Sequence, residues 1–263
     1  MIQQIEKKLK NKTEITYLGH ATVLVETCGV RLLTDPVLRN RIIHLNRVRG
    51  DIDSHKLENI DAVLISHAHW DHLDIGSLKL LDQKTLFIVP EGIDRILYRE
   101  KIKNIVVLEP GESTPVGDVI IKATYADHDG DRLRYIGHEE AVGFMIQGSS
   151  TVYFAGDTDI FPEMRDMAGE VDVALLPVWG WGPTLGDGHL DPSRAAVAAQ
   201  MIQPDIAIPI HWGTYFPFGL RWFMRNVLIE PPITFKQKTA ELAPDVKVLI
   251  LPPGDALLVH SEE

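Results

Sequence analysis

The sequence predicts an α/β fold in which two mixed β-sheets pack together and helices cover the outside. Short apolar runs rich in β-branched residues recur along the chain, and helix-like segments alternate with several of them. Other runs follow one another with only turns between, as antiparallel strands do. No sequence repeat and no linker rich in Pro, Gly or Ser divides the chain, so we expect a single domain over residues 1–263.

The first half of the chain predicts a lead-in, an antiparallel meander and a long polar insertion. Residues 1–12 form the lead-in, and Gly19 and Gly29 lie in the turns between the first three strands. Residues 36–60 are polar and irregular, which is typical of a rim or lid over a functional site. The expected elements are a helix over Gly92–Glu100 and strands over Glu14–Leu18, Thr22–Glu26, Val30–Thr34, Asp61–Ile65, Thr85–Val89, Ile105–Leu108 and Val119–Tyr125.

The second half continues with strands and two helices. Pro192 near the start of an Ala-rich segment predicts a helix over Pro192–Ile202, and Thr239–Leu242 is weakly helical. The expected strands are Val142–Gln147, Thr151–Ala155, Ala174–Pro177, Asp205–Pro209, Val246–Leu251 and Ala256–Val259.

The composition is that of a globular protein with a large core. A chain of 263 residues can bury about 70–75% of its unfolded surface and needs no disulfides. Cys28 is the single cysteine, so the sequence has no disulfide framework and no cysteine-based zinc site. Met1–Lys12 is too polar for a signal peptide, and no stretch approaches the ~18 apolar residues of a membrane span. We therefore expect a cytoplasmic protein without stable membrane insertion.

The chain is acidic, with a formal net charge of −11 and a pI of about 5.4. A protein that binds nucleic-acid polymers needs a basic face, so this charge argues against such a partner and favours a small-molecule substrate. An acidic substrate stays compatible, because bound metal ions can reverse the local field. The oligomeric state is open, and a homo-oligomer is compatible with the sequence.

The segment from Ser66 to His72 is the strongest functional signal. It contains His67, His69, Asp71 and His72, and it follows the expected strand Asp61–Ile65. After it, Asp74 or Ser77 is expected to cap a helix that carries Leu78, Leu80 and Leu81. The end of a strand in an α/β sheet is where sites are usually built. Such a polar cluster is poor core material, since each group needs a partner. The alternative is a solvated, His-rich loop.

Three further polar residues follow apolar strands directly. They are His128, Asp157 and His211, with Gly130, Gly156 and Gly213 beside them. Taken alone, each is more simply a structural His or a turn Asp. Their recurrence at strand ends, in a chain that also contains the His67 cluster, favours a shared site.

These residues make a ligand set of five His and two Asp, which suits zinc, iron or manganese. We expect two divalent metal ions, most simply Zn²⁺, whose charge Asp71 and Asp157 partly offset. Asp157 is the candidate bridge, because a carboxylate has two oxygens to share between two ions. Water bound between such ions loses a proton near neutral pH and becomes the attacking hydroxide.

At this point the sequence resembles the metallo-β-lactamase superfamily, from about Glu14 to the C-terminus. His67–His72 matches the HxHxDH motif of that superfamily, and His128, Asp157 and His211 follow in the expected order. The resemblance implies a four-layer αββα sandwich with a dinuclear metal site at one edge. It implies that His67, His69 and His128 hold one ion, that Asp71, His72 and His211 hold the other, and that Asp157 bridges them.

Finer motifs resemble one branch, which contains the N-acyl-phosphatidylethanolamine phospholipases D and the ascorbate-6-phosphate lactonases. The resemblance implies that His189 is a substrate contact or proton donor, although a plain loop His is the alternative. Asp71 and His189 are the predicted catalytic residues. Asp35 resembles a group that orients a ligand imidazole, and His20 would do the same or cap a turn. The motifs are Tyr17–Thr22, Leu33–Pro36, Ala155–Thr158, Gly188–Pro192 and Ile210–Thr214.

Two aromatic segments, Trp179–Pro183 and Tyr215–Phe223, are expected to line a pocket mouth or to pack beneath a loop. Arg221 would meet an anionic group or lie on the surface. The phospholipases carry an N-terminal extension for membranes and dimer formation that this sequence does not match, and no basic amphipathic helix suited to a bilayer is evident.

The leading functional prediction is a dinuclear metal-dependent hydrolase acting on a phosphodiester or related ester. The alternatives are a lactonase of the ascorbate-6-phosphate type and a non-catalytic metal-binding or sensor protein on the same fold. The β-lactam hydrolases are less similar, because they carry a Cys ligand and an export signal. Redox use of the fold would require a flavin domain, and a nuclease would require a basic surface.

Overall fold

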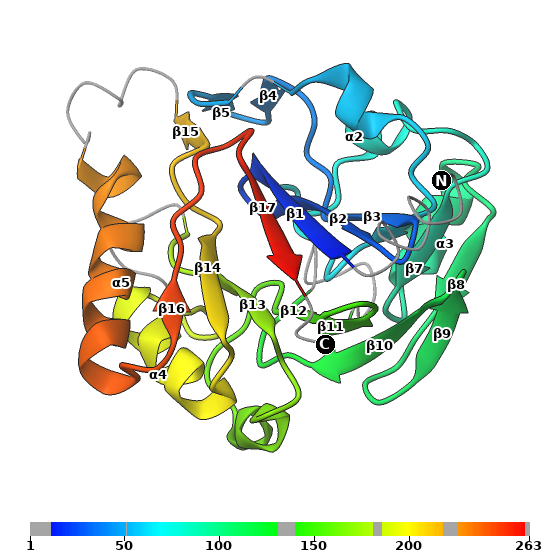
Figure 1. Cartoon of the computed structure of the whole chain (residues 1–263). Coiled ribbons are helices and arrows are strands. Elements are labelled where there is room, and N and C mark those ends of the chain that lie inside the picture. The colour runs from blue at the N-terminus through cyan, green and yellow to red at the C-terminus, as the bar shows by residue number, and fades with distance from the viewer. Residues whose placement is uncertain (1–11, 51, 131–139, 181–185, 218–225, 261–263) are drawn as a thin grey trace, which may run out of the picture.

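Two seven-stranded β-sheets lie face to face and form the centre of the molecule (Figure 1). The computed structural model describes residues 12–50, 52–130, 140–180, 186–217 and 226–260. Residues 1–11 of the expected lead-in, residues 181–183 of the first aromatic segment and residues 218–223 of the second, with Arg221 among them, lie outside these ranges. The fold class predicted from the sequence is confirmed.

The first sheet has the strand order β17-β1-β2-β3-β6-β7-β8. Strands β1 to β3 form the predicted antiparallel meander, and β3, β6, β7 and β8 run parallel to one another. The sheet is therefore mixed, and the carboxyl ends of its parallel strands share one edge. Its strands are β1 (Lys12–Gly19), β2 (Thr22–Thr27), β3 (Val30–Thr34), β6 (Ala62–Leu64), β7 (Leu86–Val89), β8 (Ile105–Val107) and β17 (Ala256–His260).

The second sheet has the strand order β16-β14-β13-β12-β11-β10-β9. Strands β9 to β12 pair antiparallel, whereas β12, β13, β14 and β16 pair parallel. Its strands are β9 (Ser113–Val116), β10 (Val119–Tyr125), β11 (Val142–Gln147), β12 (Thr151–Phe154), β13 (Val173–Pro177), β14 (Ile206–Ile210) and β16 (Lys247–Val248).

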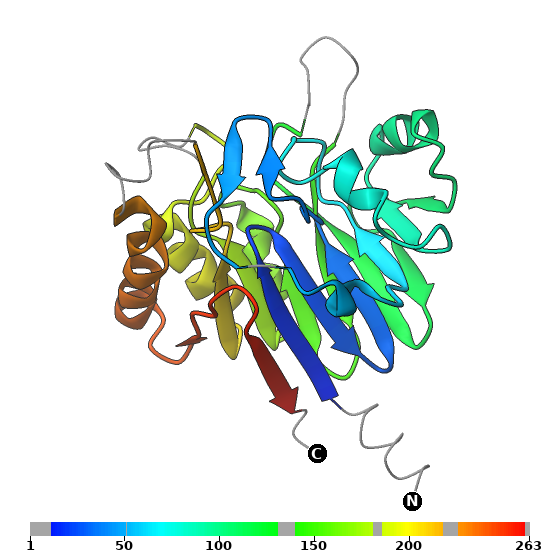
Figure 2. The same ribbon diagram turned by 90° about the horizontal axis from the view of Figure 1, so that it is seen from above.

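Helices cover both outer faces, which completes four layers (Figures 1 and 2). Helices α4 and α5 pack on each other against the second sheet, and α2 and α3 lie on the first. Asp74 caps α2, since its side chain accepts a hydrogen bond from the backbone N–H of Ser77. The helices are α2 (Ile75–Leu78), α3 (Ile93–Arg99), α4 (Pro192–Ile202) and α5 (Glu230–Leu242), with 3₁₀ turns η1 (Ser54–Leu57), η2 (Pro162–Met167) and η4 (Asn226–Leu228).

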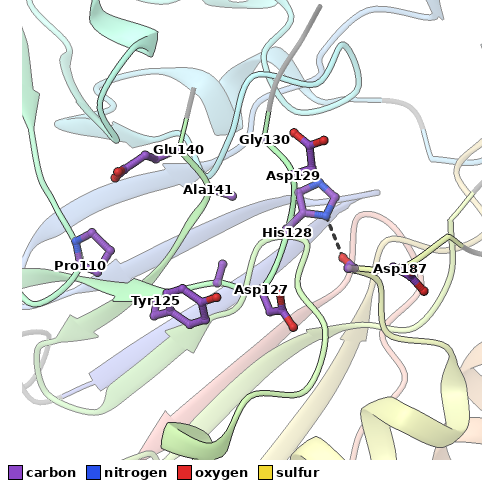
Figure 3. Close-up of a pocket in the computed structure, with 11 residues that line it drawn as sticks. Pro110, Tyr125, Asp127, His128, Asp129, Gly130, Glu140, Ala141 and Asp187 are labelled. Carbon is purple, nitrogen blue, oxygen red and sulfur yellow. Dashed lines mark hydrogen bonds between the residues drawn. The ribbon is translucent and has the colours of Figure 1, made fainter. Parts of the chain in front are cut away.

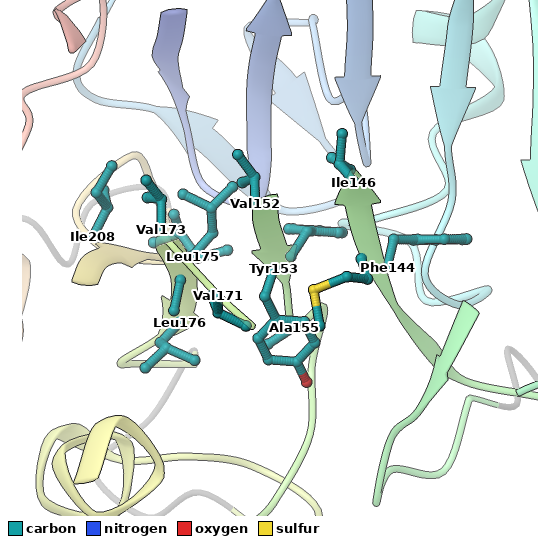
Figure 4. Packing of buried hydrophobic residues seen from close by; sticks show 14 of the residues in the cluster. Phe144, Ile146, Val152, Tyr153, Ala155, Val171, Val173, Leu175, Leu176 and Ile208 are labelled. Carbon is teal, nitrogen blue, oxygen red and sulfur yellow. The ribbon is translucent and has the colours of Figure 1, made fainter. Parts of the chain in front are cut away.

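Alternating side chains divide most of the described apolar interior into two large clusters. In β2, Val23 and Val25 face the second sheet, whereas Leu24 faces the layer with α2 and α3. The cluster between the sheets continues through the second sheet to α4 and α5, and Figure 4 shows its part around Phe144, Tyr153 and Leu175. Because both faces of the central strands are buried, a shift of register by one residue would exchange the two sets of side chains.

The polar insertion holds more structure than the sequence predicts. Within it, β4 (Arg41–Ile42) and β5 (Leu45–Arg47) form a hairpin that pairs with β15 (Tyr215–Pro217). Tyr215 packs with Val37, Ile42 and Leu45 in a small cluster of its own. The Arg47 guanidinium lies 4.8 Å from the centroid of the Tyr215 ring and donates to the carbonyls of Leu18, Val37 and Gly50.

Two helices differ from their predicted extents. Helix α5 has 13 residues, of which only the last turn is evident from the sequence. Pro231 and Pro232 hide its start, although proline is accommodated in the first helical turn because no N–H is required there. Helix α2 ends at Leu78, and Leu80 beyond it is 62% exposed. Among the helices in the described ranges, none combines the length and the apolar character that crossing a membrane requires.

Gly156 provides a test of how tightly the strand ends pack. Its φ is +62°, and a Cβ there would lie 2.7 Å from Ser66 Cβ and 3.1 Å from the Val142 carbonyl oxygen. Gly169 has a φ of +81° with nothing within 4 Å of such a Cβ. We expect Gly169→Ala to cost roughly 1–2 kcal/mol of unfolding free energy for its left-handed backbone, and Gly156→Ala to cost about 1–3 kcal/mol more for overpacking. Urea unfolding measures both, and equal losses would contradict this packing.

Candidate metal centre

The seven predicted ligand residues meet at one edge of the two sheets. They come from loops that follow separate strands, and the parallel strands bring several of these loops to the same side. His67 to His72 follow β6, His128 follows β10, Asp157 follows β12 and His211 follows β14.

The first group consists of three imidazoles. His69 Nδ1 lies 3.0 Å from His67 Nε2 and 3.2 Å from His128 Nε2. One nitrogen of each ring is within 4.8 Å of the others. His67 is fully buried, and the other two rings are half-buried. Three nitrogens at this spacing are a donor set that zinc or a similar ion accepts.

The second group combines two imidazoles with a carboxylate. His72 Nε2 and His211 Nε2 are 3.1 Å apart. Asp71 Oδ2 lies 3.6 Å from His211 Nε2 and 3.9 Å from His72 Nε2. This N₂O set is equally typical of a divalent metal.

Asp157 lies between the two groups. Its Oδ2 is 3.2 Å from His72 Nε2, and its Oδ1 is 3.6 Å from His211 Nε2. A donor atom of Asp157 is also within 4.8 Å of one in His128, from the first group. Asp157 therefore has donor atoms near both groups.

The buried carboxylate of Asp35 orients one imidazole from each group. His72 Nδ1 donates to Asp35 Oδ2 at 2.7 Å. Ser66 Oγ donates to the same oxygen at 2.5 Å and accepts from His67 Nδ1 at 2.9 Å. The backbone N–H of Ser66 donates to Asp35 Oδ1 at 2.7 Å. With Nδ1 protonated in both rings, each Nε2 presents a lone pair toward the centre.

Backbone carbonyls act in the same way on two other rings. His128 Nδ1 donates to the Gly188 carbonyl at 2.7 Å, and His211 Nδ1 donates to the Trp179 carbonyl. Their Nε2 atoms then also carry inward lone pairs, so His72 and His211 face each other as two acceptors. Two lone pairs at this distance repel unless a proton or a metal ion lies between them. The arrangement therefore fits bound divalent ions.

Burial keeps the first group neutral. It lowers the pKa of His67 and His69 below the usual range and lowers the pKa of His128 to about 4. A neutral imidazole is the form that binds a metal ion. Burial, together with the nearby His211, also lowers the pKa of His20 to about 3.

The carboxylates determine the direction of the pKa shifts of the imidazoles in the second group. Burial opposes a charge on His72 and His211, but the nearby Asp157 and Asp71 outweigh it and raise both pKa values. Burial likewise opposes ionisation of Asp71 and Asp157, and the surrounding imidazoles outweigh it and hold both carboxyl pKa values well below their usual range. The two carboxylates therefore require positive charge beside them.

His189 lies at the mouth of the centre. Its Nε2 is 3.9 Å from Asp157 Oδ2, its side chain is 30% exposed, and its ring centroid is 4.7 Å from that of His128. Its Nδ1 is 3.2–3.3 Å from the carbonyls of Asp187 and Gly186. The structure therefore brings this predicted residue beside the ligand cluster, with one ring nitrogen toward it.

The described residues of the two aromatic segments pack against each other. Trp179 stacks on Phe216 at 6.4 Å between centroids, and Phe216 is buried. Trp70, inside the His67–His72 motif, is 47% exposed.

A cavity of about 630 Å³ adjoins the centre on the His128 side (Figure 3). His128 forms part of its wall, and its hydrogen bond to Gly188 is visible there. The sequence did not identify this cavity, because its wall combines residues from distant loops. The other lining residues are Pro110, Tyr125, Ala126, Asp127, Asp129, Gly130, Glu140, Ala141, Asp187 and Gly188.

Comparison with known proteins identifies the family. A profile described as "Beta-lactamase superfamily domain" matches residues 30–212, more than half of the chain. The chain belongs to this superfamily. A UPF0173 metal-dependent hydrolase from Methanopyrus kandleri is 32% identical over 251 residues, which cover 92% of this chain and 98% of the relative. The predicted enzyme class, a metal-dependent hydrolase, is confirmed at the level of these relatives.

Two further comparisons bear on the branch and the fold. An N-acyl-phosphatidylethanolamine-hydrolyzing phospholipase D from Caenorhabditis elegans is 30% identical over 230 residues. The match covers 78% of this chain and 64% of the worm protein. Igni18, a metallo hydrolase from Ignicoccus hospitalis, superposes with a TM-score of 0.73 at 24% identity, covering 95% of this chain and 100% of Igni18. The second similarity supports the metallo-β-lactamase fold alone.

Asp35→Asn tests how far the centre depends on one buried carboxylate. The amide replaces one acceptor oxygen by a donor, so it cannot serve both His72 and Ser66. We expect the affinity for zinc, measured by competition with a chelator, to fall about 10–100-fold. The exposed Asp166→Asn is the control and should bind zinc as the unsubstituted protein does. Unchanged affinity in Asp35→Asn would show that the imidazoles need no such support.

Proposed function

We propose that this protein is a hydrolase that uses two divalent metal ions to cleave a phosphodiester or related ester, in the manner of a phospholipase D. The observation that supports it best is the pair of inward-facing donor groups that share Asp157. In this proposal one ion is held by His67, His69 and His128, the other by Asp71, His72 and His211, and Asp157 bridges them.

The residues around the centre prepare it for metal ions. Divalent ions bound there, zinc or alternatively manganese or iron, supply Lewis acidity and lower the pKa of nearby water. Asp35 and the Gly188 and Trp179 carbonyls hold the imidazole rings in the binding tautomer. Asp71 and Asp157 offset two of the four formal positive charges, so the centre retains an attraction for an anionic phosphodiester.

His189 is proposed to act on the substrate. Its Nε2 lies near Asp157 and its ring is partly exposed, so a substrate bound at the centre would meet it. From this position it would donate a proton to the leaving oxygen or hold a substrate oxygen by a hydrogen bond. Asp71 is proposed to act as a ligand and to help keep the attacking water in place.

The choice of a phosphodiester rests on the similarity to the worm phospholipase D and on the adjoining cavity. That relative hydrolyses N-acyl-phosphatidylethanolamine, as its name states. The cavity beside His128 offers about 630 Å³ for a leaving group or a substrate chain. A lactonase of the ascorbate-6-phosphate type is the second candidate, because the same centre would open a ring ester. A non-catalytic metal-binding or sensor protein is the third.

The proposal also covers the extent of the domain, the partner and the location of the protein. We infer that residues 1–263 form a single catalytic domain, which the continuous cluster between the sheets supports. The expected partner is a small ester or phosphodiester, not a nucleic-acid polymer. The expected location is the cytoplasm, because the sequence has a single cysteine.

Metal content and substrate range test this proposal together. Elemental analysis of the purified protein should give two metal equivalents per chain, and chelation should abolish hydrolysis and lower Tm, because ions that bind only the folded state stabilise it. The zinc-loaded protein should cleave aryl phosphodiesters and N-acyl-phosphatidylethanolamine in vesicles faster than lactones. Lactone opening with no diester cleavage would favour the second candidate. A metal-loaded protein inert toward every ester would favour the third.

His189→Ala tests the proposed proton donor. We expect kcat to fall about 10²–10⁴-fold, with both metal equivalents retained because His189 is not among the proposed ligands. The drop should shrink for a substrate whose leaving group needs no proton, such as p-nitrophenolate. His55→Ala is the matched control, since its side chain is 83% exposed and lies in η1. Full activity of His189→Ala on every substrate would exclude the proposed role.

A further inference from the structure

His20 occupies an unusual place for a turn residue. It lies where the chain reverses between β1 and β2, yet its side chain is only 2% exposed. Its φ is +59°, a left-handed conformation that disfavours a residue with a Cβ. Such strain persists only where the surrounding structure fixes it.

Both backbone groups of His20 are fixed by the loop that carries His211. The His20 N–H donates to Thr214 Oγ1 at 2.8 Å, and the His20 carbonyl accepts from the His211 N–H at 2.8 Å. His211 itself has a φ of +64°. The turn of the first sheet is therefore clamped to a strand end of the second sheet, directly beside the metal centre.

The clamp places the His20 ring beside Asp71. His20 Nε2 lies 3.0 Å from Asp71 Oδ2. An ionised carboxylate only accepts, so Nε2 carries the hydrogen and has no lone pair for a metal ion. The ring also packs on His211 at 3.9 Å and against the Tyr215 edge at 5.8 Å between centroids.

We propose that His20 is a positioning residue that holds Asp71 Oδ2 toward the ion bound by His72 and His211. This inference rests on the metal centre of the proposed function. Oδ2 is the Asp71 oxygen nearest to those two imidazoles, at 3.6 and 3.9 Å. The hydrogen bond from His20 restrains a carboxylate whose side chain is 17% exposed, and its loss would let Oδ2 turn toward solvent more easily.

The alternative is that His20 is itself a fourth ligand. One of its nitrogens is within 4.8 Å of donor atoms in Asp71, His72 and His211. The two roles differ in what can replace the ring. A positioning role needs only an N–H at the same reach, which a glutamine amide supplies. A ligand role needs an imidazole lone pair, which the amide lacks.

The test measures the binding of each metal equivalent in His20 variants, by zinc competition with a chelator and by the absorption bands of the cobalt-loaded protein. His20→Asn tolerates the left-handed backbone but is too short to reach Asp71, and His20→Phe keeps the ring volume without a donor. We expect both to weaken one equivalent about 10–100-fold and to leave the other unchanged. His20→Gln should restore most of the lost affinity with unshifted cobalt bands.

Several outcomes would overturn the proposal. Equal affinities in His20→Asn and in the unsubstituted protein would remove the positioning role. Failure of His20→Gln to restore affinity, with shifted cobalt bands, would make His20 a ligand. Loss of both equivalents together with a lower Tm of the metal-free protein would make it a structural residue. His55→Phe controls for the loss of an imidazole in general and should bind both equivalents normally.

The experiment separates this inference from the proposed function. An unsubstituted protein that binds fewer than two equivalents would contradict the two-metal proposal itself. Two equivalents in that protein, with no selective loss in His20→Asn or His20→Phe, would contradict only the role of His20.

Discussion

The constraint on which the site depends is the close packing of buried imidazole rings whose outward nitrogens are already hydrogen-bonded. Asp35, through His72 Nδ1 and Ser66, and the carbonyls of Gly188 and Trp179 take up the outward nitrogens. A neutral ring then has no hydrogen on its inward nitrogen, and the raised pKa values of His72 and His211 indicate that a proton takes this place when no metal ion does. In the proposed function divalent ions take this place, and the buried carboxylates Asp71 and Asp157 add to the attraction for positive charge.

The two sheets hold these imidazole rings in place. A loop on the surface could turn its imidazoles toward water, but His67 and His72 are fully buried and follow a strand that is buried on both faces. The outer layers matter for the same reason, because they hold the strands in register. The rigid sandwich thus holds the donor atoms close together before any ion binds.

Much of the fold could be predicted because alternating apolar residues and turn glycines are local signals. Val30–Thr34 and Pro192–Ile202 have their expected bounds. The hairpin of β4 and β5 could not be found, since two- and three-residue strands show no periodicity and Tyr215, their partner, is distant in the sequence. The His67–His72 motif is local and evident from spacing alone. The part of His20 is not, because it depends on a clamp to Thr214 and His211, almost two hundred positions away.

Arg47 supplies positive charge to the fold by a different means. Its guanidinium donates to the carbonyls of three separate segments, at Leu18, Val37 and Gly50, and packs over the ring of Tyr215. A lysine has a single ammonium and cannot span the same three oxygens in a plane. These segments are therefore held together by a positive charge that the polypeptide carries permanently, whereas the proposed metal centre would take its positive charge from bound ions. Removal of metal should therefore loosen the ligand loops, while the segments that Arg47 ties together stay in place.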